Sequence, residues 1–127
     1  MRVTTTNSAD PGDEVLLVGR TFRGPATWCG DARVEAGAVV DVELDVDDVV
    51  DWADIAIFDT PPDLPTVTAE GVLVAGPVVA LEEDDILTVS VDDSLVMIET
   101  TGAAPIRFEG RHVLLRARDL RAHPFLL

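Results

Sequence analysis

The residue types best suited to nucleophilic catalysis in this chain are one cysteine and two histidines. Cys29 lies within the run Trp28-Cys29-Gly30-Asp31, whereas His112 and His123 lie near the C-terminus. A thiol becomes a nucleophile when an imidazole accepts its proton and a third group orients that imidazole. The sequence therefore permits a small Cys-dependent hydrolase or transferase that uses Cys29 with His112 or His123. We favour the simpler interpretation, a partly buried structural cysteine beside a tryptophan.

Patterns for redox, calcium and zinc chemistry are not met. A thioredoxin-type site needs a second thiol three positions after the first, and Ala32 stands there. A helix-loop-helix calcium loop starting at Asp41 needs glycine at its sixth position and glutamate at its twelfth. Those positions hold Val46 and Trp52. One cysteine and two separated histidines supply too few ligands for a zinc site, so we expect neither a metal nor a cofactor.

A second feature is a run of carboxylates in the middle of the chain. Between Val40 and Val46, apolar residues alternate with acidic ones, which puts one set in the core and the other in water. Trp52 lies just beyond and is a candidate aromatic anchor for a partner. The candidate binding residues are Asp41, Glu43, Asp45, Asp47, Asp48, Asp51, Trp52 and Asp54.

The charge is unevenly distributed. The net charge is −15; residues 31–99 hold nineteen acids and only Arg33, whereas residues 100–127 hold two acids and five arginines. Such a charge repels phosphate groups, so we expect no nucleic acid or membrane partner and we expect attraction to a basic protein. The alternative is an ordinary water-facing strand whose acids are partly neutralised within the chain by the C-terminal arginines: Arg107, Arg111, Arg116, Arg118 and Arg121.

The elements that position these groups are predicted to be strands. The alternation from Ala38 to Val46 is the clearest, followed by a helical turn capped by Asp47 or Asp48 and a strand that ends at Phe58. About eight short strands indicate an all-β fold with at most one short helix, arranged as an antiparallel β-sandwich or small barrel. The other expected strands are Glu14–Val18, Val72–Val74, Val78–Leu81, Ile86–Val91, Leu95–Glu99, Ile106–Phe108 and His112–Arg116.

The chain length matches one domain of ordinary size. Residues 1–13 are polar and are predicted to form a flexible lead-in to a single β-rich domain over residues 14–127. The N-terminus lacks the apolar stretch of a secretory signal, and the longest nearly apolar run, Gly71 to Leu81, is short for a membrane helix. We therefore expect a soluble cytoplasmic protein.

These observations favour a non-enzymatic acidic module that binds a basic protein, as an adaptor or as an immunity-type inhibitor would. A first alternative is a structural subunit that self-associates through strand edges and the apolar end Pro124–Leu127. The second alternative is the Cys29 enzyme. A homo-oligomer is compatible with each of the three hypotheses.

Overall fold

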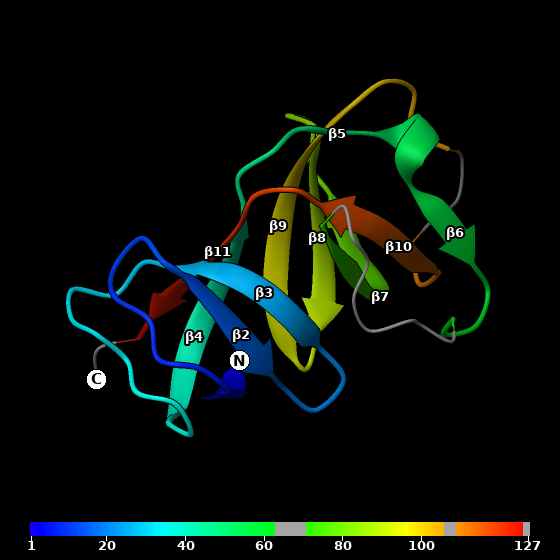
Figure 1. The fold of residues 1–127 in the computed structure, drawn as a ribbon. Coiled ribbons are helices and arrows are strands. Elements are labelled where there is room, and N and C mark those ends of the chain that lie inside the picture. Colours follow the sequence, from blue (N-terminus) through cyan, green and yellow to red (C-terminus); the bar gives the residue numbers. More distant parts are fainter. Residues whose placement is uncertain (63–70, 106–108, 126–127) are drawn as a thin grey trace.

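The computed structural model describes residues 1–62, 71–105 and 109–125, and strands dominate it (Figure 1). The expectation of an all-β fold with a small barrel is confirmed, and the predicted helical turn is a single 3₁₀ turn, η1. The expected strand Ile106–Phe108 lies outside the described residues. The elements are β1 Arg2–Thr5, β2 Glu14–Val18, β3 Arg23–Trp28, β4 Val39–Val46, β5 Val50–Asp51, η1 Trp52–Asp54, β6 Ala56–Phe58, β7 Val72–Leu81, β8 Ile86–Val91, β9 Ser94–Thr101, β10 His112–Ala117 and β11 Leu120–Pro124.

Five strands close into a barrel in the order β1-β2-β3-β11-β4. All neighbours in it are antiparallel except β3 and β11, which run parallel. The last strand of the chain therefore enters between β3 and β4 and completes the barrel. Side chains that alternate along these strands point inward, where aliphatic residues such as Val15, Leu17 and Val42 are fully buried.

The first residues belong to the barrel, which corrects the expectation of a flexible lead-in. β1 pairs with β2 on one side and with β4 on the other. Val3 is buried, and the Met1 ammonium group donates a hydrogen bond to the Val42 carbonyl at 2.8 Å. The polar appearance of this segment is misleading because threonine is β-branched and fits a strand well.

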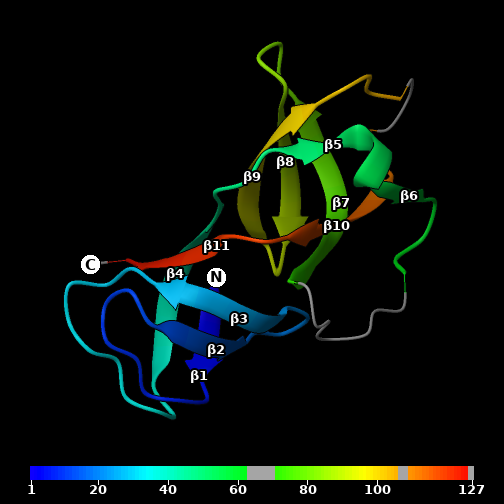
Figure 2. The ribbon, with the colours of Figure 1, turned by 45° about the horizontal axis from the view of Figure 1, so that its top comes forward.

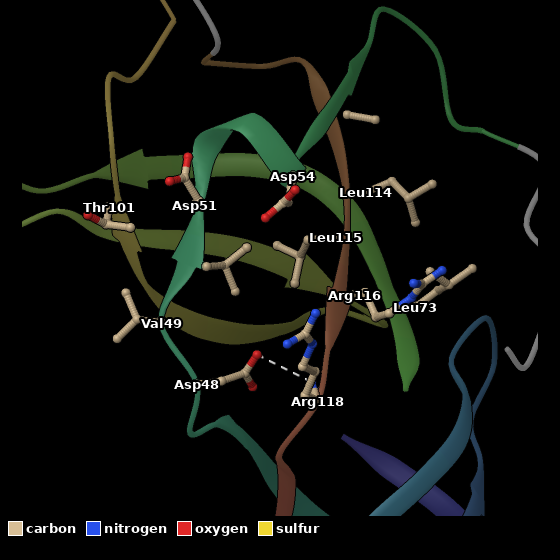
Figure 3. A pocket seen from close by; sticks show the side chains of 12 residues that line it. Asp48, Val49, Asp51, Asp54, Leu73, Thr101, Leu114, Leu115, Arg116 and Arg118 are labelled. Carbon is tan, nitrogen blue, oxygen red and sulfur yellow. Dashed lines mark hydrogen bonds between the residues drawn. The ribbon is translucent and has the colours of Figure 1, made fainter. Parts of the chain in front are cut away.

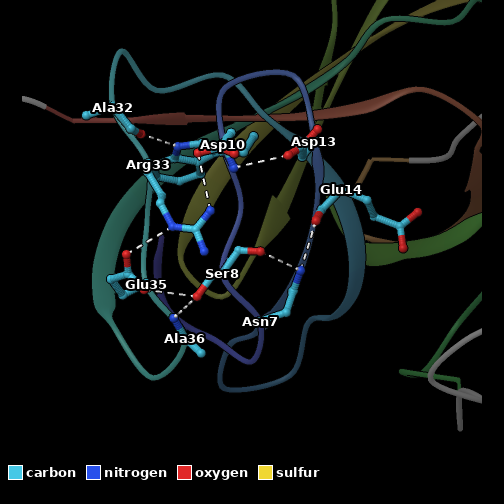
Figure 4. A network of polar contacts seen from close by, with 10 residues as sticks. Asn7, Ser8, Asp10, Asp13, Glu14, Ala32, Arg33, Glu35 and Ala36 are labelled. Atoms are coloured by element: carbon cyan, nitrogen blue, oxygen red, sulfur yellow. Dashed lines mark hydrogen bonds and ion pairs between the residues drawn. The ribbon is translucent and has the colours of Figure 1, made fainter.

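The loop that follows β1 is also held in place, by a polar network (Figure 4). The Arg33 guanidinium contacts Glu35 at 3.0 Å and Asp10 at 3.3 Å, and the Ser8 hydroxyl donates to Glu35 at 3.1 Å. Asn7 bridges to the next strand, since its amide oxygen accepts from the Leu16 N–H at 2.7 Å. Arg33, the one arginine of residues 31–99, therefore forms its ion pairs within the chain.

Six further strands form a second, curled sheet in the order β5-β9-β8-β7-β10-β6 (Figure 2). Its neighbours are antiparallel except β5 and β9. β7 carries an irregularity between Val78 and Ala80, where one extra residue shifts the pairing with β8, and such a bulge bends a strand. The two edge strands of this order, β5 and β6, follow each other in the chain and are joined by η1 and Ile55.

Two antiparallel segments of the chain connect the barrel to the curled sheet. One leads from β4 into β5 and the other from β10 into β11. β4 also contacts β9 of the curled sheet. Trp28 packs in the barrel with its indole N–H donating to the Ala32 carbonyl at 2.8 Å, and a Cβ at Gly30 would lie 2.7 Å from its ring. Glycine at that position lets the next loop close over the indole.

A carboxylate on the curled sheet fastens the barrel to it. Asp92 and Asp93 form the β8–β9 turn at φ 49° and 63°, a region that aspartate tolerates. The Asp92 carboxylate accepts the N–H of Thr21 at 2.8 Å, the N–H of Phe22 at 3.1 Å and the Thr21 hydroxyl. Partial burial by itself raises the pKa of Asp92, but these hydrogen bonds outweigh it and hold the pKa below its ordinary value.

We expect Asp92→Asn to lower the free energy of unfolding by about 1–2 kcal/mol, because an amide offers one acceptor oxygen where the carboxylate offers two. Urea denaturation at neutral pH measures the change. The pKa of Asp92 is lower in the folded state than in the unfolded state, so its contribution is complete above about pH 4 and is lost as the pH falls through the folded value. The difference between the two proteins should therefore shrink as the pH falls below about 4.

Asp93→Asn is the matched control. Asp93 lies in the same turn with a similar φ, and its carboxylate makes an exposed ion pair with Arg20 at 2.7 Å. Loss of such a pair changes stability by less than about 1 kcal/mol. Equal losses in the two variants would show that the turn, and not the Asp92 hydrogen bonds, matters.

Candidate functional site

The predicted carboxylates Asp41, Glu43, Asp45 and Asp47, which we call the acidic stripe, lie along the outer face of β4 and just beyond its end. Val42, Leu44 and Val46 are buried, while Glu43 and Asp45 between them are exposed. The alternation inferred from the sequence is therefore present in the structure. Because β4 is paired on both sides by β1 and β11, the side chains of those strands decide how much of the negative charge remains unpaired.

The ends of the stripe are neutralised within the fold. On the β1 side, Arg2 contacts Asp41 at 3.2 and 3.3 Å, and this hydrogen-bonded pair lowers the pKa of Asp41. On the β11 side, Arg121 contacts Asp47 at 2.9 Å and Asp119 at 3.2 Å. Neutralisation by a C-terminal arginine, the alternative considered from the sequence, thus holds for Asp47. Arg107 lies outside the described residues.

The two carboxylates at the centre of the acidic stripe, Glu43 and Asp45, are not paired with described residues. Glu43 lies opposite His123, and Asp45 lies opposite Arg121, in the pairing of β4 with β11. Neither carboxylate forms a hydrogen bond or an ion pair with any residue that the structure describes. Both are therefore available to a group outside the chain.

The two strands of the β4–β11 ladder separate just beyond the acidic stripe, at a point that we call the fork. The β4–β11 pairing ends at Val46 and Leu120 and is extended by a hydrogen bond from the Asp47 N–H to the Asp119 carbonyl at 2.8 Å. The Asp48 carboxylate then accepts the backbone N–H groups of Arg118 at 3.3 Å and Asp119 at 3.1 Å. Past this point β5 pairs with β9 and β10 pairs with β7, so the two chain passages separate.

A groove of about 520 Å³, which we call the seam groove, opens where they separate (Figure 3). Asp48 and Arg118 lie at the fork end, and Asp51 and Asp54 lie at the end near η1. Apolar side chains line much of the remainder. The lining residues are Asp48, Val49, Val50, Asp51, Asp54, Ala56, Leu73, Thr101, Leu114, Leu115, Arg116 and Arg118.

The carboxylates near η1 differ in how they are used. Asp51 is the N-cap of η1, and its side chain accepts the Ala53 N–H at 2.8 Å, as capping aspartates do. The predicted cap was Asp47 or Asp48, so the helical turn begins later than expected. Asp54 is exposed, and within the described part of the chain its carboxylate has no hydrogen bond or ion pair.

Trp52 is not an exposed anchor, which corrects the role inferred from the sequence. Only 7 % of its surface is exposed. The 3₁₀ turn directs its ring into the core of the curled sheet while Asp51 and Ala53 on either side face water. A partner bound at the surface therefore meets carboxylates here and not the indole.

Cys29 lies beside His123 in the barrel, whereas His112 belongs to the curled sheet. Its N–H donates to the Ala122 carbonyl at 2.9 Å, which sets it next to His123, and both residues line a depression of about 390 Å³ on the barrel. Its thiol contacts the Thr27 carbonyl at 3.6 Å, and among the described residues no hydrogen bond joins Cys29 to His123. His112 belongs to β10 in the curled sheet and lines another pocket.

Comparisons with known proteins leave the function to be argued from the site. No family model matches the chain, and no curated protein or solved structure shows significant similarity to it. Among the described residues, no three Cys, His, Asp or Glu side chains are grouped so that they could hold a metal ion. None of the helical segments described is long and apolar enough to cross a membrane.

The fork, and the position of Arg116 and Arg118 at the groove, could not be predicted from the sequence. Arg116 and Arg118 were noted as possible partners for acids, and the structure places both on the wall opposite β5. The one feature of the sequence that pointed to these arginines was the cationic C-terminal segment. What the sequence lacked was the pairing that brings this segment to the acidic one, because the two are far apart in the chain.

We expect Asp48→Asn to cost about 1–2 kcal/mol of folding free energy, because its carboxylate accepts two backbone N–H groups that otherwise lose a charged acceptor. Asp47→Asn is the matched control, since it removes only an exposed ion pair with Arg121 and should cost less than about 1 kcal/mol. Thermal or urea unfolding of both variants measures the difference. Indistinguishable variants would contradict a structural role for Asp48 at the fork.

Proposed function

We propose that this chain is a non-enzymatic acidic module that binds a basic protein. The observation that carries the proposal is that three of the predicted binding carboxylates, Glu43, Asp45 and Asp54, are exposed and have no partner among the described residues. Two lie on the β4–β11 ladder, and the third lies over the seam groove into which that ladder opens. Adaptors and immunity-type inhibitors are concrete forms of such a module.

The charge of the whole chain supports this choice. A protein of net charge −15 produces a field that attracts basic partners over about a Debye length. Exposed carboxylates at the rim of an interface then raise the association rate and make binding dependent on salt. The apolar side chains Val49 and Leu114 of the seam groove add contact surface that carboxylates alone do not provide.

The alternatives have weaker support. An enzyme that uses Cys29 needs an imidazole hydrogen-bonded to the thiol and a third group that orients it, whereas the Cys29 thiol contacts a backbone carbonyl. A self-associating subunit is supported by Phe125, half of whose surface is exposed at the C-terminal end. Light scattering of the purified protein tests self-association directly.

We expect the tagged protein to capture one stoichiometric basic protein from a lysate of its source organism at low salt, and less of it near physiological salt. The variant Glu43→Gln/Asp45→Asn/Asp54→Asn should bind that protein at least about tenfold more weakly, since three exposed ion pairs together contribute about 1.5 kcal/mol. Captured proteins are identified by mass spectrometry, and the affinity is then measured with the purified partner.

The control is Glu82→Gln/Glu83→Gln/Asp84→Asn, which removes the same number of charges from the exposed turn between β7 and β8. It should retain nearly full affinity. If both triple variants weaken binding equally, the partner responds to net charge and not to this surface. An empty capture at both salt concentrations would contradict the proposal.

A further inference from the structure

Three neighbouring strands of the curled sheet carry almost no charge. β7 and β8 contain no charged residue, and β9 contains only Glu99. Their inward side chains, such as Val74, Leu87 and Ile98, are buried in the core. An antiparallel strand with one face in water alternates apolar and polar residues, whereas the run from Gly71 to Leu81 is nearly all apolar. β7 therefore has the sequence of a strand with two covered faces.

The outward side of these strands is nevertheless exposed. Val79 lies in the β7 bulge with 52 % of its surface exposed, and Leu95 and Met97 of β9 are 58 % and 56 % exposed. Strand pairing places Ala80, Thr88 and Met97 in one row across the three strands, and Leu95 lies on the same side as Met97 because strand side chains alternate. We call these five residues the outer sheet face. Contiguous exposed apolar surface of this kind marks an interaction site.

The distribution of charge indicates which partner this face suits. A chain of net charge −15 repels a second copy of itself, and that repulsion is weakest where the touching surfaces carry no charge. A basic partner is instead attracted to carboxylates, such as Glu43 and Asp45 on the outer face of β4. The outer sheet face has no carboxylate and so offers such a partner no ion pair.

We propose that two copies of this chain associate by packing their outer sheet faces against each other. Two-fold contacts are the commonest arrangement of soluble oligomers, and they bring the same patch of both copies together. Side chains of two packed sheets interdigitate across about 10 Å. The inference goes beyond the proposed function, because the outer sheet face contains none of the acidic stripe.

The carboxylates at one end of the face determine how the two copies are oriented. The acidic turn at residues 82–85 lies at the same end as Glu99, since Ile86 pairs with Glu99 and the Thr100 N–H donates to the Asp85 carbonyl at 2.9 Å. A two-fold axis along the strands would bring the acidic ends of both copies together. An axis across the strands places them at opposite ends of the contact, so we expect antiparallel strand directions.

The test measures self-association of the full chain by sedimentation equilibrium from about 10 μM to about 1 mM. Three strands about 4.8 Å apart make a face only about 14 Å wide, so we expect a weak, reversible dimer. Its Kd should be at least about threefold lower in 0.3 M salt than in 0.03 M salt, because salt screens the repulsion between the two copies. Binding of a basic partner has the opposite dependence on salt.

The two methionines of the chain report where the copies touch. Met1 is buried in the barrel, whereas Met97 lies on the outer sheet face. In protein labelled with ¹³C at the methionine methyl groups, the Met97 signal should shift with concentration in step with the measured mass. The Met1 signal should stay in place. A mass that rises while the Met97 signal remains fixed would overturn the proposal.

Met97→Lys should weaken association at least about a hundredfold, because each dimer would bury two ammonium groups without partners. The substitution makes the chain less negative, so a loss of association does not come from added repulsion between whole chains. Val39→Lys is the matched control, since Val39 is 64 % exposed on β4 of the barrel and the charge change is the same. It should leave the Kd within about twofold.

The outcomes separate this inference from its alternatives. A protein that stays monomeric at about 1 mM in both salt concentrations would overturn it, and so would a Met97→Lys variant that associates like the unaltered chain. Dissociation by Phe125→Ala but not by Met97→Lys would assign the contact to the C-terminal end instead. Capture of a basic partner through Glu43 and Asp45 is unaffected by any of these results.

Discussion

The interaction on which the arrangement of this protein depends is the antiparallel ladder between β4 and β11 and its end at Asp48. The ladder supplies one wall of the barrel, and its two strands continue as β5 and β10 in the curled sheet. Where the next backbone pair of the ladder would form, the Asp48 carboxylate instead accepts the N–H groups of Arg118 and Asp119. The same two segments of chain therefore close the barrel and then separate at the seam groove.

The many carboxylates of the chain serve two different purposes. Some are structural: Asp48 ends the ladder, Asp51 caps η1, and Asp92 fastens the β2–β3 loop to the curled sheet. Each of these accepts backbone N–H groups, which a carboxylate does well because it carries charge and several acceptor sites. Others, such as Glu43 and Asp54, face solvent without a described partner, and only this group is available for recognition.

Local patterns in the sequence predicted local structure well. The alternation around Leu44 and the strand Ile86–Val91 are present as expected, because the side-chain period of a strand depends on neighbouring residues. β1 was missed because it has one aliphatic residue, Val3, among threonines. The burial of Trp52 and the seam groove were missed because they depend on pairings between distant segments, which one sequence does not specify.

The most direct test of how the ladder ends is amide hydrogen exchange in the protein and in its Asp48→Asn variant. The amides of Arg118 and Asp119 donate to the Asp48 carboxylate, so both should exchange at least about tenfold faster in the variant. The amide of Ala122, whose strand is paired on both sides, should be unchanged. Equal exchange of Arg118 and Asp119 in the two proteins would contradict the account of a ladder that ends at Asp48.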